Sequence, residues 1–482
     1  MRSDTVSPTA SQHIARFSHR FGPAHLKPAH YAQVGRALID TVGVALAGHR
    51  EPATRCVAQY LAATSLQPPQ TARSPHSARD AHAHAPAPVA WAWDQHAALH
   101  PADAALYNGV AGHVLDFDDV NSPLRGHPSI ALLPALIALG QTHDVSGPRM
   151  VSAYVVGFEV MVRLARAMVQ DHYARGWHAT TTLGVIGAAA GCSHALELND
   201  TQTVHALALA VAQAGGTRAN FGTMAKSFQA GQCGSSAVRA ALLAGCGLDG
   251  AVDALDGPQG LTRLYGQGES LADTWADTWA DLGRAPLEIE ASGIEIKKYP
   301  MCYAAHRALD GMLDLRDEHG LEADQVQSIQ VYANHRALVP LIHTQAQTGL
   351  EGKFSMHYAM AAALLDGHVG LSSFTDPAVQ RPQAQAVMRR VTCMEDAGPA
   401  TPRWNRLTVT LTCGQRLERT VHDLRGSAAL PLSEEALRAK WRDCLSYAAA
   451  TQDGDAFFEG AMALDRIGVR ELMRRVPPLA AP

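Results

Sequence analysis

The sequence of 482 residues predicts a mainly α-helical fold, in which a large all-helical domain carries an inserted, smaller α+β lid domain. Hydrophobic residues make up 47% of the chain but aromatic residues only 6%, which indicates a large core of small aliphatic side chains. Helical spacing dominates until a strand-like pattern begins near residue 268, and helical spacing returns after residue 424. We therefore expect one domain formed by residues 1–267 and 425–482, with a lid formed by residues 268–424.

The helices of the larger domain are predicted in chain order. The first follows Ser11 as its cap and places Ile14 and Phe17 on one face. A second covers residues 27–49, whereas residues 65–102 are rich in Pro, Ala and His and are expected to form loops. Four apolar segments then predict helices that are buried inside a bundle, at residues 150–168, 181–198, 203–216 and 235–250. From Ser433 the chain is expected to be helical again and to return to the first domain.

The predicted lid combines strands with helices. Residues 326–334 alternate strictly between apolar and polar side chains, and residues 407–423 predict a hairpin that turns at Cys413 and Gly414. Residues 287–300 also have a strand-like pattern. Two helices are expected between these strands, at residues 303–320 and 353–367.

Composition argues against several functional classes. A formal charge of −5 gives no basic surface for nucleic acid. No segment approaches the roughly 20 apolar residues that cross a bilayer, and the N-terminus lacks the apolar region of a secretory signal, so we expect a cytoplasmic protein without a membrane partner. The eight cysteines form no C-x-x-C pair, which argues against a zinc knuckle or a disulfide scaffold.

The segment HVLDFDDVNSPLRGHPSIALLPAL, residues 113–136, is unusual because it is both acidic and apolar. Asp116, Asp118 and Asp119 lie within four positions, and His127 comes just before an aliphatic run. A buried carboxylate is costly unless it is paired, so such residues are often functional. The structural alternatives are an exposed turn or a helix cap for the aspartates, and a hydrogen-bonded core residue for His127.

Polar side chains interrupt apolar or Gly-rich segments at further places. They are His178 in GWHATTT, Lys226 in GTMAKSFQAG, the group Lys297, Lys298, Cys302 and His306 in IKKYPMCYAAH, and Lys353, His357 and Tyr358 in GKFSMHYAMAAALL. Each also has a structural explanation: a helix cap, an exposed strand end, a packed thiol or a core aromatic residue. Together, however, the lysines and histidines could neutralise a substrate with several carboxylates. An aspartate and a histidine could then move a proton at a carbon next to a carboxylate.

Metal and nucleotide chemistry are less well supported by these patterns. The chain has no H-x-x-x-H or H-E-x-x-H motif, and an Asp cluster that binds Mg²⁺ would normally serve a phosphate substrate. The segment GVIGAAAG lacks the preceding strand and the following acidic residue of a dinucleotide site. We therefore expect no metal.

The motifs HVLDFDDV…HPS, GWHATTTLGVIGAAAG, AQAGGTRANFGTMAKSFQAG, IKKYPMCYAAHRALDG and GKFSMHYAMAAALLDG resemble those of the MmgE/PrpD family. This family includes 2-methylcitrate dehydratase, cis-aconitate decarboxylase and iminodisuccinate epimerase. The resemblance covers nearly the whole chain from about residue 10. It implies a helical domain with an α+β lid, a homodimer, an active site between the domains, and neither metal nor organic cofactor.

The resemblance places the family's motif residues on Asp118, His127, His178, Lys226, Lys297 and Tyr358, and we assign the following roles as hypotheses. The acid/base pair is Asp118 and His127, with Asp116 and Asp119 as neighbours of Asp118. Carboxylates are bound by Lys226, Lys297 and His178. Tyr358 orients the substrate or carries a proton. The catalytic set is then Asp118, His127, Lys226, Lys297 and Tyr358, and the substrate-binding set is Asp116, His178, Lys298, Cys302 and His306.

The family shares one intermediate, a carbanion or enediolate next to a carboxylate, and its members differ in the fate of that intermediate. A lyase acting on a di- or tricarboxylate, either dehydratase-like or decarboxylase-like, is the first prediction. The segment with Cys302 and His306 departs from the methylcitrate dehydratases, which weakens a transfer of that exact substrate. An epimerase of an amino-dicarboxylate such as iminodisuccinate is the alternative, with Lys298 or His306 opposite His127. An inactive helical scaffold is the second alternative.

Overall fold

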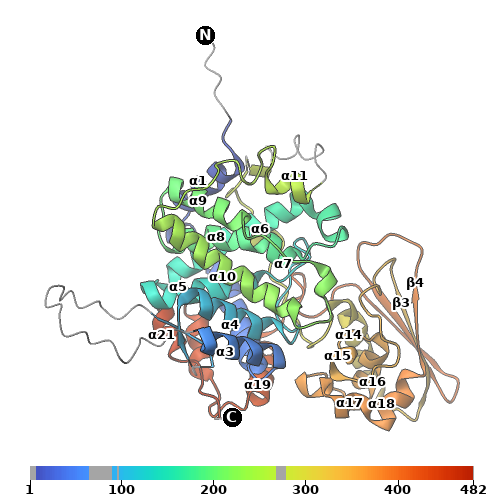
Figure 1. Ribbon diagram of the computed structural model, residues 1–482. Helices are drawn as coiled ribbons and strands as arrows, with labels where there is room; N and C mark the ends of the chain where they lie inside the picture. Colours follow the sequence, from blue (N-terminus) through green and yellow to red (C-terminus); the bar gives the residue numbers. More distant parts are fainter. Residues whose placement is uncertain (1–6, 65–88, 95–96, 267–277, 280, 481–482) are drawn as a thin grey trace.

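The computed structural model describes residues 7–64, 89–94, 97–266, 278–279 and 281–480 (Figure 1). Its described elements are mostly helices, accompanied by one four-stranded sheet and one short two-stranded sheet. The prediction of a mainly α fold with some β structure is therefore confirmed. Most of the segment expected to form loops, residues 65–88, lies outside the described residues.

The larger part of the chain, which we call the helical body, is built from helices that precede residue 297 or come after residue 432. A two-stranded sheet, β1 (Ala90–Trp91) with β2 (Ala98–Leu99), lies in the same part. Its helices are α1 (Ala10–Arg20), α2 (Pro28–Gly48), α3 (Pro52–Thr64), α4 (Pro101–His113), α5 (Pro128–His143), α6 (Gly147–Ala174), α7 (Ala179–Thr182), α8 (Gly184–Ala195), α9 (Asp200–Val211), α10 (Ala225–Gly245), α11 (Leu261–Tyr265), α13 (Glu288–Ala291), α19 (Glu434–Tyr447), α20 (Asp455–Met462) and α21 (Val469–Met473).

One hydrophobic core joins the two ends of the chain within this body. Ile14 and Leu38 from the first helices share it with Trp441, Phe457 and Val469 from the last ones. Figure 1 shows α19 and α21 in red near the blue and cyan helices, and α19 packs against α2 and α21 against α5. The C-terminal helices thus pack on the helical body, although more than 130 residues of the smaller unit separate them from it in sequence.

Glycines allow α4 and α10 to pack closely and in opposite directions. A Cβ on Gly109 would lie 2.6 Å from the Cα of Gly231, and a Cβ on Gly231 would lie 2.4 Å from the carbonyl oxygen of Leu106. A side chain at either position would therefore force the helices apart. Because the two helices are antiparallel, the end of α4 at His113 lies near Lys226 in the first turn of α10.

The remaining elements form a smaller unit with its own hydrophobic core. Its sheet has the strand order β4-β3-β5-β6, in which β3 pairs parallel with β4 and antiparallel with β5. Helices α14 and α16 pack against this sheet. The elements are α14 (His306–His319), β3 (Val326–Ala333), α15 (Gly349–Gly352), α16 (Met356–Asp366), α17 (Asp376–Gln380), α18 (Pro382–Met388), β4 (Val391–Glu395), β5 (Asn405–Leu411) and β6 (Arg416–Val421).

Two local predictions are wrong. Residues 287–300 do not form a strand: they contain the helical turn α13, because the Glu290 side chain accepts the Leu287 backbone N–H and stabilises a helix start there. Only Glu295 makes a β-bridge, with Val120. The first helix is capped by Thr9 rather than Ser11, which is buried inside the helix. In contrast, β3, the β5–β6 hairpin, α14 and α16 all lie where the pattern placed them.

None of the described helices is both long and apolar enough to cross a bilayer. All eight cysteines lie in described segments, and none of them forms a disulfide.

Candidate active site

The site is built around residues 114–127, which connect α4 to α5 and which we call the acidic loop. Pro128 begins α5 directly after His127, since its ring favours the first position of a helix. The loop is held in shape by the bridge from Val120 to Glu295 and by the Asn121 N–H, which donates to the Gly126 carbonyl. Asp116 adopts a left-handed backbone conformation with φ 53°, which aspartate tolerates better than most side chains.

Asp116 joins two lysines from distant segments. Its Oδ1 lies 2.5 Å from the Nζ of Lys226, and its Oδ2 lies 3.0 Å from the Nζ of Lys297. Lys297, which is 1% exposed, also donates to the Asp116 carbonyl at 2.6 Å. Burial alone would raise the pKa of Asp116, but the two ammonium groups outweigh it and hold that pKa well below its usual range.

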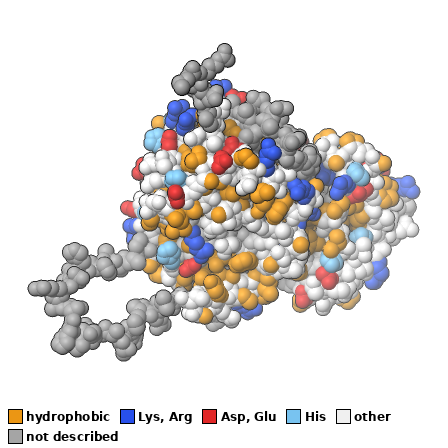
Figure 2. Space-filling view, turned by 45° about the horizontal axis from the view of Figure 1, so that its top comes forward, with side chains coloured by type: hydrophobic (Ala, Val, Ile, Leu, Met, Phe, Trp, Pro, Cys, Tyr) orange, Lys and Arg blue, Asp and Glu red, His pale blue; other side chains and the backbone are white. Residues whose placement is uncertain are grey.

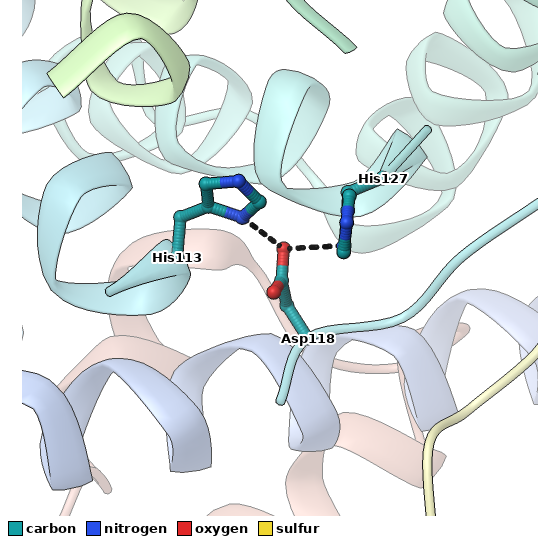
Figure 3. A group of neighbouring side chains, drawn as sticks. All are labelled: His113, Asp118 and His127. Carbon is teal, nitrogen blue, oxygen red and sulfur yellow. Dashed lines mark hydrogen bonds and ion pairs between the residues drawn. The ribbon is translucent and has the colours of Figure 1, made fainter. Parts of the chain in front are cut away.

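Asp118 lies between two histidine rings (Figure 3). Its Oδ2 accepts a hydrogen bond from His113 Nδ1 at 2.8 Å and lies 3.1 Å from His127 Nδ1. The other ring nitrogen of His127, Nε2, lies 3.9 Å from Asp116 Oδ1. His127 therefore connects the fully buried Asp118 to the Asp116–lysine group, as an acid/base residue held by an orienting carboxylate would.

Burial sets the charge of the remaining imidazoles. Burial lowers the pKa of His113 to about 4, although Asp118 opposes this effect, so the ring is neutral near pH 7. Burial lowers the pKa of His178 well below its usual value, because it disfavours the protonated ring, and protonation of the neighbouring His113 would act in the same direction. His178 Nδ1 lies 2.8 Å from Gln229 Oε1. A neutral ring can donate one hydrogen bond and accept another without adding charge to the site.

Several buried polar atoms of this group have no hydrogen-bond partner among the described residues. They are Asp118 Oδ1, His113 Nε2, His178 Nε2 and His127 Nδ1, the last of which lies within ion-pair distance of Asp118 Oδ2 without hydrogen-bond geometry. Buried polar atoms are almost always satisfied in folded proteins, so a set of exceptions in one place indicates a position for water or a ligand. His178 comes from the segment before α7, where its backbone caps the helix but its side chain does not.

Two residues of the smaller unit, Lys353 and Cys302, complete the group around Asp116, Asp118 and His127. The Nζ of Lys353 donates a hydrogen bond to the Leu115 carbonyl at 2.5 Å. The backbone carbonyl of Lys353 accepts a hydrogen bond from the Cys302 N–H at 3.0 Å. Burial raises the pKa of the Cys302 thiol to about 11, and the charge of Asp116 acts in the same direction, so the thiol is protonated. We call Asp116, Asp118, His113, His127, His178, Lys226, Lys297, Lys353 and Cys302 the ligand side of the acidic loop.

The opposite side of the loop, which we call the anchoring side, is formed by Asp119, Ser129, Tyr154, Asp40 and Lys440. Asp119 accepts the backbone N–H of Ser129 at 3.2 Å and also pairs with its hydroxyl, which lies 2.7 Å from the Tyr154 hydroxyl. Burial and the nearby charge of Asp40 raise the pKa of Asp119 well above its usual value. Asp119 thus fastens the loop to α5 and does not face the lysines of the ligand side.

Lys440 of α19 holds the acidic loop in place from the anchoring side. Its Nζ donates to the carbonyls of Phe117 at 2.7 Å and Lys297 at 2.8 Å, and it forms an ion pair with Asp40 of α2. Phe117 separates Asp116 from Asp118, so one ammonium group links the acidic loop to the segment that carries Lys297. Neither Lys440 nor His113 was predicted from the sequence, because both lie within ordinary helical patterns.

The structure brings most of the predicted site residues together, but two lie elsewhere. The Nζ of Lys298 lies 5.3 Å above the Tyr299 ring, and its strongest charged neighbour is Asp310, since successive residues of an extended segment point to opposite sides. Tyr358 lies in the core of the smaller unit, where its hydroxyl donates to the Ser373 carbonyl. Among the described residues, neither side chain forms a hydrogen bond or ion pair with the group around Asp116 and Asp118.

His306 takes an intermediate place. It is fully buried, and its Nε2 lies 3.2 Å from the Met301 carbonyl, between the rings of Tyr299 and Tyr303. Burial, followed by the charge of Lys297, lowers its pKa well below the usual value. His306 therefore lies near Lys297, but its hydrogen bond and ring contacts are made with Met301, Tyr299 and Tyr303 rather than with the acid/base pair.

Three ligand-side residues also form a possible metal site. One ligand atom each from His113, Asp118 and His127 lies within 4.8 Å of the others. The donor set is chemically suited to zinc or a similar ion. However, a neutral His113 that donates its Nδ1–H to Asp118 has no lone pair on that nitrogen for a metal. Metal binding through this nitrogen would therefore require His113 to give up its hydrogen bond to Asp118.

A mainly helical fold with buried acids, imidazoles and lysines around one loop is typical of enzymes that bind anionic ligands and move protons. Comparison with known families gives the particular class. The MmgE/PrpD N-terminal domain matches residues 12–273, and the MmgE/PrpD C-terminal domain matches residues 299–465. The chain belongs to the MmgE/PrpD family, as its motifs predicted.

Curated relatives agree with this assignment. The chain is 29% identical over 358 residues to a cis-aconitate decarboxylase of Homo sapiens, a match that covers 71% of this chain and 72% of the relative. It is 30% identical over 359 residues to the Mus musculus cis-aconitate decarboxylase, with the same coverage. A cis-aconitate decarboxylase-like protein of Aspergillus oryzae is 27% identical over 372 residues, covering 72% of this chain and 76% of that protein. An enzyme of this family is therefore supported.

Proposed function

We propose that this protein is a cofactor-independent lyase that decarboxylates cis-aconitate or a closely similar tricarboxylate. The observation that carries the proposal is the ligand side of the acidic loop, where two lysines share Asp116 and His127 lies between Asp116 and the buried Asp118. The similarity to the cis-aconitate decarboxylases favours loss of carbon dioxide over loss of a hydroxyl group.

The chemistry requires charge stabilisation followed by one proton transfer. Cleavage of the bond to the departing carboxylate releases carbon dioxide, and its electron pair moves through the double bond to the carbon beside another carboxylate. A proton is then added at that carbon. Because the intermediate places negative charge on the remaining carboxylate, cationic groups at that position lower the barrier.

Residue roles are assigned from the positions of the side chains. Lys226 and Lys297 bind the carboxylate on which charge develops, and Asp116 holds the two ammonium groups close together. His127 delivers the proton, while Asp118 fixes the orientation of its ring. His178 donates to or accepts from a further ligand oxygen through its free Nε2.

Proton NMR in deuterium oxide tests the proposal directly. The protein is incubated with cis-aconitate, citrate, 2-methylcitrate and aspartate-derived dicarboxylates. We expect cis-aconitate to disappear with the appearance of a methylene dicarboxylate that carries one solvent deuterium next to a carboxylate. Formation of an unsaturated acid from a hydroxy acid would instead establish a dehydratase, and deuterium exchange without a new compound would favour an epimerase. A lack of any reaction or thermal shift across the panel would favour a scaffold.

Removal of metal ions tests the absence of a metal role. We expect activity to survive dialysis against a chelator, because His113 uses its Nδ1–H to bind Asp118. Elemental analysis of the dialysed protein is the control. Loss of activity that returns on addition of one divalent ion would instead assign His113, Asp118 and His127 as its ligands.

A further inference from the structure

Lysine is rare in this chain and is concentrated at one place. Only six of the 40 Lys and Arg residues are lysines, and four of them contact the acidic loop. The four are Lys226, Lys297, Lys353 and Lys440. The other 34 basic residues are arginines, and the blue side chains in Figure 2, where Lys and Arg share one colour, are scattered over the face shown. The four positions at the acidic loop therefore favour a compact ammonium group that can approach a carboxylate or carbonyl end-on.

The four ammonium groups differ in their partners. Lys226 and Lys297 share the carboxylate of Asp116, and Lys440 pairs with Asp40. In the described part of the chain, the hydrogen-bond partner of the Lys353 ammonium is a neutral carbonyl, that of Leu115. One of the three N–H groups of the Lys353 ammonium thus donates a hydrogen bond, and no carboxylate of the described residues is in contact with it.

This arrangement is unfavourable for the protein alone. Lys353 is 7% exposed, and a buried charge is costly unless an opposite charge compensates for it. Burial lowers the pKa of Lys353 to about 8, and the repulsion from Lys297 and Lys226 acts in the same direction. The carboxylates of Asp116 and Glu51 oppose this shift from a distance and do not cancel it. An anion placed at the ammonium group would remove the penalty.

We propose that Lys353 is a substrate-binding residue that receives a carboxylate of the ligand beyond the one bound by Lys226 and Lys297, so that the site selects a tricarboxylate over a dicarboxylate. This proposal rests on the proposed function, because it assigns the same site a preference among carboxylates. Lys353 belongs to the smaller unit and reaches the loop of the helical body, so the ligand carboxylate would also join the two parts.

Isothermal titration calorimetry of single variants tests the role of Lys353. The ligands are cis-aconitate and tricarballylate as tricarboxylates, and maleate and glutarate as dicarboxylates. Lys353→Gln keeps a donor for the Leu115 carbonyl and removes only the charge. Lys353→Arg keeps the charge. Lys27→Gln is the matched control, since Lys27 is exposed and pairs with Glu290 away from the site.

We expect K353Q to weaken tricarboxylate binding by about 10- to 100-fold, the size of one charge-assisted hydrogen bond, and dicarboxylate binding by less than about threefold. K353R should bind within about tenfold of the wild type, and K27Q should be unchanged. Equal affinity of K353Q and the wild type for every ligand would overturn the proposal, and so would an equal loss for both ligand classes.

The outcomes separate this proposal from the proposed lyase function. A wild-type protein that binds tricarboxylates through Lys353 but converts none of them would leave this inference intact and overturn the lyase. A wild-type protein that decarboxylates cis-aconitate while K353Q binds and reacts normally would do the reverse. Failure of the wild type to bind any of the four ligands would overturn both.

Discussion

Buried aspartates and lysines occur on both sides of the acidic loop. On the ligand side they form the proposed substrate site, whereas on the anchoring side they hold the loop in place. Asp116 and Asp119 are three positions apart and both are buried, yet the pKa of Asp116 is held well below its usual range and that of Asp119 well above it. The difference comes from partners that are distant in sequence: two lysines reach Asp116, whereas Asp119 meets Ser129 and the charge of Asp40. A carboxylate therefore acquires its role from the groups that the fold places beside it.

The largest expected effect is on the ligand side. His127→Ala should lower kcat by about 10²- to 10⁴-fold, the range of a general acid or base, and should change the melting temperature little. Steady-state kinetics and thermal unfolding measure the two quantities. His143→Ala is the control, because His143 lies exposed at the other end of α5. Full activity of H127A on its true substrate would exclude the assigned role.

The second test breaks the anchoring side. Lys440→Met should lower the free energy of unfolding by about 3–5 kcal/mol, since it leaves Asp40 buried without its counter-ion. Lys27→Met, which breaks an exposed pair, should cost at most about 1 kcal/mol. Chemical denaturation gives both values. Similar losses for the two variants would mean that the anchoring side contributes no more than a surface contact.

A pair of isosteric substitutions sharpens the comparison. Asp116→Asn should lower kcat/KM by about 10- to 100-fold, because it removes the charge that holds two lysines. Asp119→Asn should lower it by less than about threefold. The raised pKa of Asp119 means that its carboxyl group retains a proton more readily, so an amide is a close substitute. Equal losses would contradict a division of the loop into two sides.

The smallest expected effect is a pH dependence of ligand affinity. The free protein loses the Lys353 proton as the pH rises through about 8, whereas a bound carboxylate keeps that proton in place, so binding takes up a proton. Tricarboxylate affinity should therefore fall by up to about tenfold per pH unit above pH 8. The raised pKa of Lys226 keeps that group charged in this range. K353Q should show a shallower profile by calorimetry, and an identical profile would exclude Lys353 as the titrating group.

The local pattern of apolar, polar and turn-forming residues was sufficient to predict most of the helices and strands. The alternation in residues 326–334 and the Cys413-Gly414 turn predicted β3 and the β5–β6 hairpin, because a half-buried strand and a tight turn each leave a short-range signature. The segment 287–300 was misassigned since its β-like composition competes with the Glu290 cap, which depends on side-chain geometry. The strand β4 was not predicted, and its pairing with β3 is parallel and distant in sequence.

The site was predicted less completely, for a related reason. Polar residues in apolar segments identified Asp116, Asp118, His127, Lys226 and Lys297, which the structure brings together. Tyr358 was included by motif position and Lys298 as a polar residue next to Lys297, although the direction of a side chain depends on backbone contacts that neither criterion contains. Lys440 and His113 were missed because a single polar residue on a helix is usually exposed. Their contacts could be recognised only once α4, α19 and the loop were placed in space.

The position of Lys440 along the chain has a consequence for biosynthesis. Every acid, base and lysine of the ligand side precedes residue 354, but the ammonium group that joins the carbonyls of Phe117 and Lys297 is added almost ninety residues later. A nascent polypeptide that has just completed the smaller unit therefore carries every residue of the ligand side but lacks Lys440, which links the acidic loop to the segment that carries Lys297. We expect catalytic competence to arise late in translation, when α19 leaves the ribosome and packs against helices from the start of the chain.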